Sequence, residues 1–194
     1  MRLRSVNGTP PTPPSLPPDM ARWTRIGASV ALVAFVADQA SKAWILHGLR
    51  LPERPPIRIA PLFELVMVWN RGISYGLFQQ HADLGRYLLV AVSVVAAVGL
   101  SVWLMRAKSA LVALALGLLI GGALGNAVDR LVYGAVADFV LLYWIPFFPY
   151  VFNVADSAIV AGVALLLYDS VLVEGRKERS AGPGAAGVDP GAGI

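Results

Sequence analysis

The sequence of 194 residues contains no cysteine and only two histidines, His47 and His81. Without cysteine the chain cannot form a disulfide, an iron–sulfur cluster, a zinc knuckle or a thiol nucleophile. The two histidines do not form an H-E-x-x-H motif, which excludes a zincin site. The residues therefore offer no ligand set for a catalytic metal, and we expect neither a metal nor another cofactor.

Charged residues are also scarce. They make up 14% of the sequence, whereas an average soluble domain carries roughly 25%. Hydrophobic residues make up 57%, and a water-soluble globule of this size cannot bury so much apolar surface. The composition therefore excludes an ordinary soluble enzyme and predicts an integral membrane protein, mainly α-helical. The net charge of +4 is small and spread over loops and tails, so we expect no nucleic-acid partner.

Four apolar runs are long enough to cross a bilayer as helices, at residues 26–46, 87–105, 110–128 and 151–173. At about 1.5 Å per residue each run covers roughly 28–35 Å. We assign these spans to one transmembrane domain, 23–175. A proline-rich disordered tail, 1–22, precedes it, and an Ala/Gly/Pro-rich disordered tail, 176–194, follows it.

The basic residues predict the orientation of the spans. Four spans place both tails on one side of the membrane, and that side holds nine Lys and Arg residues against six on the other. The positive-inside rule then puts both termini in the cytoplasm. We expect a multi-pass membrane protein.

The two outer connections are richer than simple loops. Between the first two spans, residues 57–69 partly alternate apolar and polar side chains and are broken by Pro61, which predicts β-strands. The second connection, 131–150, is aromatic, and we interpret its aromatic residues as interfacial anchors. These are Tyr143, Trp144, Phe147, Phe148 and Tyr150.

Polar residues gather at one depth, in the outer part of the membrane. They come from three spans and from the last outer connection, and they are Asp38, Asn126, Asp129, Asp138, Asn153 and Asp156. Asn126 and Asp129 are three residues apart, so we expect them to share a helix face, and Asn153 and Asp156 repeat that spacing. Ionisable residues inside a membrane are costly and usually functional.

Several carboxylates crowded into a low-dielectric site cannot all ionise. One then holds a proton while its neighbour stays charged, which is the condition for acid–base chemistry on water in aspartic proteases. Asp38 has Lys42 one turn away, and Asp129 could pair with Arg130 or another cation, so these two acids can instead belong to ion pairs that tie helices together. Asp138 and Asp156 have no cation close in sequence.

Four sequence blocks resemble one known family, in the right order and over residues 24–173. They are DQASK at 38–42, NRGISYG at 70–76, GGALGNAVDR at 121–130 continuing to GAVADF at 134–139, and FNVADS at 152–157. In this order they are similar to the bacterial lipoprotein signal peptidases, the signal peptidase II family. Ile73, Ser74 and Tyr75 stand where small residues and Phe are common in that family.

The resemblance implies four transmembrane helices, an outer β-sheet and an intramembrane aspartic endopeptidase. Such an enzyme removes the signal peptide of prolipoproteins before a cysteine that carries diacylglycerol. Asp138 and Asp156 would be catalytic. The substrate-binding and supporting residues would be Asp38, Lys42, Asn70, Gly72, Asn126, Asp129, Arg130 and Asn153. We expect a monomer that contacts membrane lipids, with its active site near the outer leaflet.

A proton-coupled transporter or channel could use the same acids, and a non-enzymatic membrane assembly factor is a third possibility. The acids gather at one end, however, and apart from Asp169 the inner half of the spans carries no ionisable side chain. That pattern does not form a path across the membrane. Gly117, Gly121, Gly122 and Gly125 predict close packing between helices.

Overall fold

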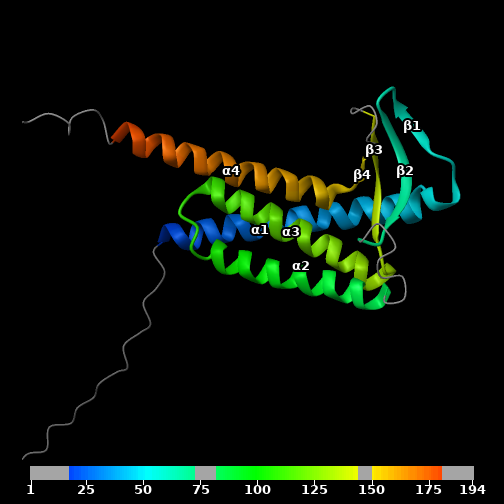
Figure 1. Cartoon of the computed structure of the whole chain (residues 1–194), viewed down its shortest axis with the longest axis horizontal. Helices are drawn as coiled ribbons and strands as arrows, with labels where there is room; N and C mark the ends of the chain where they lie inside the picture. The colour runs from blue at the N-terminus through cyan, green and yellow to red at the C-terminus, as the bar shows by residue number, and fades with distance from the viewer. Residues whose placement is uncertain (1–17, 73–81, 144–149, 181–194) are drawn as a thin grey trace, which may run out of the picture.

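A computed structural model describes residues 18–72, 82–143 and 150–180, and it consists there of four long helices and a small sheet (Figure 1). The helices are α1 (Pro18–Ala43), α2 (Ala82–Leu104), α3 (Ala110–Tyr133) and α4 (Val154–Ser180). All four are long and apolar enough to span a membrane. The predicted four-helix membrane fold is confirmed.

The helix ends differ from the predicted domain limits. Helix α1 begins at Pro18, inside the tail predicted for 1–22, because proline is tolerated in the first helical turn and Met20 and Ala21 are good helix formers. Helix α4 continues to Ser180, five residues into the tail predicted from 176, because Lys, Glu and Arg follow the apolar run. The rest of both tails lies outside the described residues.

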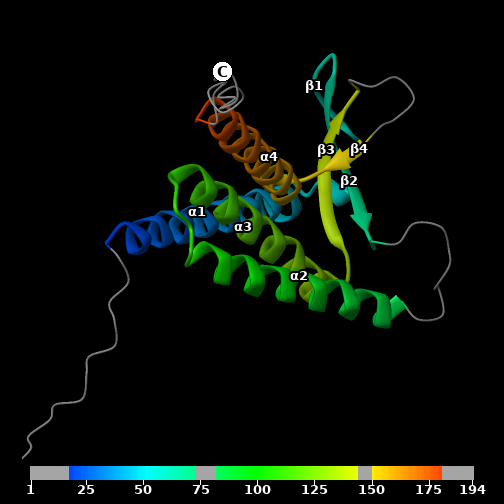
Figure 2. The ribbon, with the colours of Figure 1, turned by 60° about the vertical axis from the view of Figure 1, so that its left-hand side comes forward.

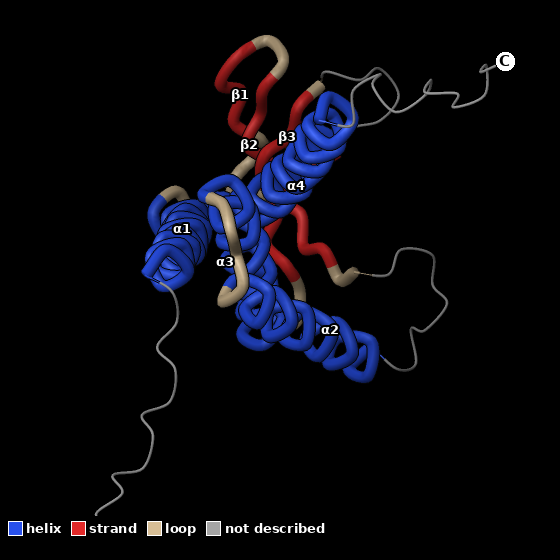
Figure 3. The backbone as a smooth tube through the Cα atoms, turned by 90° about the vertical axis from the view of Figure 1, so that its left-hand side faces the viewer, coloured by secondary structure: helices blue, strands red, loops and turns tan. Residues whose placement is uncertain are grey.

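Helix α3 is the centre of the bundle and contacts the other three helices, while α2 and α4 lie apart on either side of it (Figure 3). Its glycines permit this packing. A Cβ on Gly121 would lie 2.5 Å from the Ala31 carbonyl oxygen of α1, and one on Gly122 would lie 2.5 Å from the Ala155 carbonyl oxygen of α4. These contacts confirm the predicted small-residue packing.

Helix α1 turns one narrow stripe toward α3. Its buried positions are Gly27, Ala31, Ala34, Asp38 and Lys42, at steps of three or four residues. Such spacing places side chains on a single helix face. The stripe is made of small residues over two turns and becomes charged only near the end of the helix, where the sheet begins.

Apolar side chains also cover the outer surfaces of helices α1, α2 and α4. Leu32 and Val33 of α1, Val95 of α2 and Val160 of α4 are each more than 60% exposed. Exposed apolar helix faces of this kind are suited to lipid rather than water.

The sheet lies across the end of the bundle (Figure 2). Its strands are β1 (Ile57–Ala60), β2 (Phe63–Asn70), β3 (Val136–Leu142) and β4 (Tyr150–Phe152), paired antiparallel in that order. Strands β1 and β2 confirm the prediction from 57–69, and Pro61 lies in the turn between them.

Strands β3 and β4 were not predicted. Residues of β3 are buried on both faces, so the strand has no alternation of apolar and polar residues to reveal it. Strand β4 is three residues long and takes Val151 and Phe152, so α4 starts at Val154 and not at the predicted 151. Leu131 to Tyr133 belong to α3.

A cluster of buried apolar side chains joins the sheet to the bundle. It contains Ile45, Leu51, Leu65 and Phe139. After Ala43 the helix widens into one π-helical turn, Trp44–Gly48, which carries the buried Ile45. This core anchors the sheet against the end of α1.

Two of the predicted aromatic anchors, Tyr143 and Tyr150, are exposed, as an interfacial position requires. The other three, Trp144, Phe147 and Phe148, lie outside the described residues.

Candidate active site

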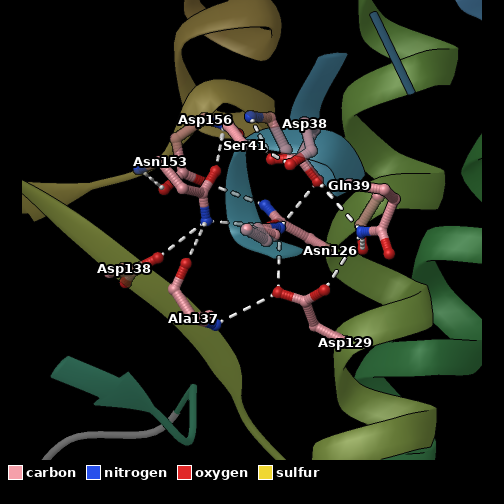
Figure 4. A network of polar contacts seen from close by, with 12 residues as sticks. Asp38, Gln39, Ser41, Asn126, Asp129, Ala137, Asp138, Asn153 and Asp156 are labelled. Carbon is pink, nitrogen blue, oxygen red and sulfur yellow. Dashed lines mark hydrogen bonds and ion pairs between the residues drawn. The ribbon is translucent and has the colours of Figure 1, made fainter. Parts of the chain in front are cut away.

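The buried polar side chains of the described residues gather where the bundle meets the sheet (Figure 4). They are Asp38, Lys42, Asn126, Asp129, Asp138 and Asn153, and Asp156 lies among them, partly buried. Every one belongs to the set that the sequence singled out. Side chains that the sequence placed at a similar depth therefore lie close together in the fold.

Asp138 lies in the middle of the sheet, on β3, opposite Val68 of β2. Its carboxylate accepts hydrogen bonds from the amide nitrogens of Asn153 at 2.7 Å and Asn70 at 3.0 Å. Burial raises the pKa of Asp138 from 3.8 to about 6, and the nearby Asp156 charge acts in the same direction. The two amide bonds and the charge of Lys42 oppose this rise.

Asp156 lies in the first turn of α4. The amide nitrogen of Asn126 donates to Asp156 Oδ1 at 2.8 Å. The backbone N–H of Asp156 donates to Asn153 Oδ1 at 2.9 Å, and that of Asn153 donates back to Asp156 Oδ2 at 3.3 Å. This reciprocal pair is a capping box. Asn153 therefore precedes the helix, and the prediction that it shares a helix face with Asp156 is wrong.

Asn153 connects the two acids. Its Nδ2 donates to Asp138 Oδ1 at 2.7 Å and to Asn126 Oδ1 at 3.1 Å, while its Oδ1 accepts from the backbone of Asp156. One asparagine side chain thus bonds to both aspartates. Because its contacts come from α3, β3 and α4, it links the carboxylate of Asp138 to the first turn of α4, which carries Asp156.

Asp38 and Asp129 share one cation. Lys42 Nζ lies 2.7 Å from Asp38 Oδ2 and 2.8 Å from Asp129 Oδ2, and all three side chains are almost fully buried. Asp129 is therefore paired with Lys42 across two helices and not with its neighbour Arg130. The sequence left open whether Asp38 and Asp129 belong to ion pairs, and the structure shows that they do. In the described residues no ion pair involves Asp138 or Asp156.

Arg130 and Gly72 complete the rim of the site. The guanidinium of Arg130 donates to the Asn126 carbonyl oxygen at 3.1 Å, and its charge acts on both Asp138 and Asp156. A Cβ on Gly72 would lie 3.8 Å from Arg130 Nη2 and would clash with Leu89. Gly72 also has a φ of +90°, which other residues rarely adopt.

Gly72 orients the amide of Asn70. Its backbone N–H donates to Asn70 Oδ1 at 2.8 Å, so Asn70 Nδ2 points at Asp138. Residues 73–81, which contain Ile73, Ser74, Tyr75 and His81, lie outside the described residues.

Two residues of the cluster were not predicted as site residues. Gln39 Nε2 lies 3.1 Å from Asp129 Oδ1 and 3.2 Å from both Asp38 Oδ2 and the Gly125 carbonyl oxygen. A Cβ on Gly125 would lie 2.5 Å from Asp38 Oδ2, so this glycine admits the carboxylate as well as the neighbouring helix. The position of Gln39 beside Asp38 in the DQASK block was the one available signal.

The described residues contain no group of three His, Cys, Asp or Glu side chains arranged to hold a metal ion. His47 is exposed. The cluster instead offers carboxylates, amides and two cations. It can hold, accept and release protons, and it can donate hydrogen bonds to a peptide.

Comparison with known proteins agrees with the sequence blocks. The profile of the family described as Signal peptidase (SPase) II matches residues 30–172. A lipoprotein signal peptidase from Methylorubrum extorquens is 58% identical over 147 residues, which cover 76% of this chain and 86% of that protein. One from Beijerinckia indica is 50% identical over 149 residues, which cover 77% of this chain and 89% of that protein.

Solved structures agree with the fold. A bacterial membrane enzyme determined by the in meso method at 2.3 Å has a TM-score of 0.67 with this chain and is 20% identical, and the match covers 84% of this chain and 94% of that one. A second such structure, at 1.9 Å, has a TM-score of 0.65 and 22% identity, covering 74% and 90%. With the family match over residues 30–172, the conclusion is that this chain belongs to the signal peptidase II family.

Proposed function

We propose that this chain is a lipoprotein signal peptidase in which Asp138 and Asp156 are the catalytic acid–base pair. The observation that carries the proposal is their shared contact with Asn153, without an ion-pair partner for either acid among the described residues. Two carboxylates held together by neutral amides at a buried site share a proton more readily than they both ionise.

In the proposed mechanism, one aspartate takes a proton from water as the water oxygen attacks the scissile carbonyl carbon. The other donates a proton to the developing oxyanion. When the tetrahedral intermediate breaks, the carbon–nitrogen bond cleaves and the amine leaves with the proton that the first aspartate took from water. As the carbonyl re-forms, the hydroxyl of the intermediate returns its proton to the second aspartate, so the pair regains its starting state. Each step moves a proton between water, peptide and carboxylate, so the chemistry needs no metal and no other cofactor.

The remaining predicted residues would support this chemistry. Asn70, held by Gly72, and Asn153 donate to Asp138, while Asn126 donates to Asp156. Arg130 lies beside Gly72. Among the described residues, its Nη1 donates to the carbonyl oxygen of Asn126, and its buried Nε has no acceptor. We assign that guanidinium to the binding of a substrate carbonyl oxygen.

The proposed substrate is a prolipoprotein, cleaved before a cysteine that carries diacylglycerol. A signal peptide is an apolar helix, and it would reach the site sideways from the bilayer, along α3 between α2 and α4, which lie apart (Figure 3). We propose that the sheet end of the bundle faces the outer leaflet of the inner membrane, that both termini are cytoplasmic and that the enzyme acts as a monomer.

We also propose that the catalytic domain, 23–175 by sequence, is sufficient, and that tails 1–22 and 176–194 take no part in cleavage. The alternative of a proton-coupled transporter gains no support from the relatives, which are lipoprotein signal peptidases.

The test is cleavage of a diacylglyceryl-modified prolipoprotein by the purified chain in lipid, compared with the same prolipoprotein before lipid modification. We expect cleavage before the cysteine of the modified substrate, unaffected by EDTA. Product ends are identified by mass spectrometry. Absence of cleavage together with proton flux in liposomes would support the transporter instead, and inhibition by EDTA that added metal reverses would refute the aspartic mechanism.

A further inference from the structure

Lys42 makes three polar contacts inside the cluster. Its ammonium donates to Asp38 Oδ2 at 2.7 Å, forms an ion pair with Asp129 Oδ2 at 2.8 Å and donates to Asn126 Oδ1 at 3.2 Å. The Lys42 side chain is 3% exposed, so water does not compete for these contacts.

Both acids bound by Lys42 also hold backbone N–H groups. Asp38 Oδ1 accepts from Ala155 N at 2.8 Å, and Asp129 Oδ2 accepts from Ala137 N at 3.1 Å (Figure 4). Ala155 directly precedes Asp156, and Ala137 directly precedes Asp138. Each member of the proposed catalytic pair therefore follows a residue whose backbone is held by one of the two lysine-bound carboxylates.

The third contact of Lys42 sets the direction of an amide. Because Lys42 donates to Asn126 Oδ1, the Nδ2 of Asn126 must face the other way, and there it donates to Asp156 at 2.8 Å. With the opposite orientation the amide oxygen would face a carboxylate. The lysine thus keeps a donor on Asp156.

We infer that Lys42, Asp38 and Asp129 form one positioning unit, which sets the separation and hydrogen bonding of the catalytic aspartates without contacting the substrate. The inference rests on the proposed function, since it takes Asp138 and Asp156 as the catalytic pair. The single charge of Lys42 lies between two carboxylates that would otherwise repel each other, and those carboxylates hold the backbone of α4 at Ala155 and of β3 at Ala137. A misplacement of about 1 Å costs on the order of 100-fold in rate.

Four variants test the unit by different means. Lys42→Met keeps most of the length of the side chain and removes the charge. Asp129→Asn keeps an oxygen for Ala137 N–H, whereas Asp129→Ala removes it. Gly125→Ala changes no charge, but its new Cβ would lie 2.5 Å from Asp38 Oδ2 and would push that carboxylate away from Ala155.

Matched controls come from positions outside the cluster. Lys108→Met removes an exposed lysine. Gly99→Ala adds a methyl group to a transmembrane helix at a site with no atom within 4 Å. Both controls should keep the wild-type kcat and KM.

The measurements are kcat and KM separately, with protein yield and thermal denaturation as folding checks. We expect kcat to fall about 100-fold in Lys42→Met and in Gly125→Ala, with KM within about threefold of wild type. Asp129→Asn should keep about ten times more activity than Asp129→Ala, because it retains the acceptor. Should Lys42→Met fail to fold, Gly125→Ala and the two Asp129 variants decide the inference.

A spectroscopic measurement separates positioning from general stability. The charged groups acting on Asp138 are Asp156 on α4, Arg130 on α3 and Lys42 on α1. Lys42 lowers the pKa of Asp138, so Lys42→Met should move the titration of the Asp138 carboxyl infrared band to higher pH. Lys108→Met should leave it unchanged.

Wild-type kcat in folded Gly125→Ala or Lys42→Met would overturn the inference. So would complete inactivity of folded Asp129→Asn, which would make Asp129 a group that exchanges protons with the substrate. Cleavage near the wild-type rate by Asp138→Asn or Asp156→Asn would instead refute the proposed catalytic pair, whatever the other variants do. The two failures are therefore distinguishable.

Discussion

The polar end of the bundle holds two pairs of acids within one hydrogen-bonded network, and all but the partly buried Asp156 are buried. Asp38 and Asp129 share the ammonium of Lys42 and hold backbone N–H groups. Asp138 and Asp156 contact amides of asparagine and backbone N–H groups but no cation as an ion pair in the described chain. All four residues are aspartates of one cluster, but the groups that their carboxylates bind differ.

This difference leads us to expect different roles for the two pairs. Protonation of Asp38 or Asp129 would weaken their contacts with Lys42 and with the backbone N–H groups of Ala155 and Ala137. An acid bound by neutral amides has no such constraint, and burial already raises the pKa of Asp138 to about 6. We therefore expect proton exchange at the second pair and rigidity at the first.

The largest effect should follow from removing the exchangeable proton. Asp138→Asn and Asp156→Asn should each lower kcat at least 1,000-fold, roughly 4 kcal/mol in activation free energy, because asparagine nearly matches the shape of aspartate but cannot act as acid or base. Initial rates on a lipid-modified prolipoprotein measure this, with membrane insertion as the folding check.

The double variant of Asp138 and Asp156 should be no slower than either single variant, because groups that act as a unit are not additive. Asp169→Asn, near the far end of α4, is the matched control and should keep full activity. Substantial cleavage by Asp138→Asn would contradict the proposal that the second pair exchanges protons and the first pair does not.

The second effect concerns stability and pH. The pKa of Asp138 rises from 3.8 to about 6 on folding, a shift worth about 3 kcal/mol. Because the folded pKa is raised, the stabilising contribution of the protonated acid is present at low pH and is lost as the pH rises through about 6. Asp138→Asn is neutral at every pH, so its melting temperature should exceed that of wild type at pH 8 and approach it below pH 4. Thermal denaturation at several pH values tests this, and a constant difference would contradict it.

A smaller loss should follow from shortening the amides that join the two pairs. Asn126→Ala and Asn153→Ala each leave a buried carboxylate short of a hydrogen bond, which costs about 1–3 kcal/mol, or roughly 10- to 100-fold in rate. Both variants should still fold. Measured kcat values at the wild-type level would show that the amide network does not act on the catalytic pair.

The smallest effect should come from removing the chain ends. Residues 1–17 and 181–194 lie outside the family match at 30–172. A protein without them should insert into membranes and cleave at the wild-type rate. Loss of activity at normal expression would give the tails a part in the reaction.

The sequence by itself determined the membrane fold and most members of the polar cluster. Four apolar runs predict four spans because the bilayer requires about 20 apolar residues per helix. Polar residues such as Asp38 on the first span and Asp129 on the third stand out because ionisable groups are costly in lipid. Strands over 57–69 could be predicted as well, because the side chains partly alternate there.

Only the tertiary structure decided the partners of each acid. Asp129 could be paired with adjacent Arg130 by sequence, yet its cation is Lys42, 87 positions away along the chain. Strand β3, which carries Asp138, is buried on both faces and shows no periodicity, and Asn153 has helical spacing to Asp156 but caps the helix. Hydrogen bonds between segments distant in sequence depend on how α1, α3, α4 and the sheet pack. The spacing of residues along the chain does not determine which of these segments contact each other.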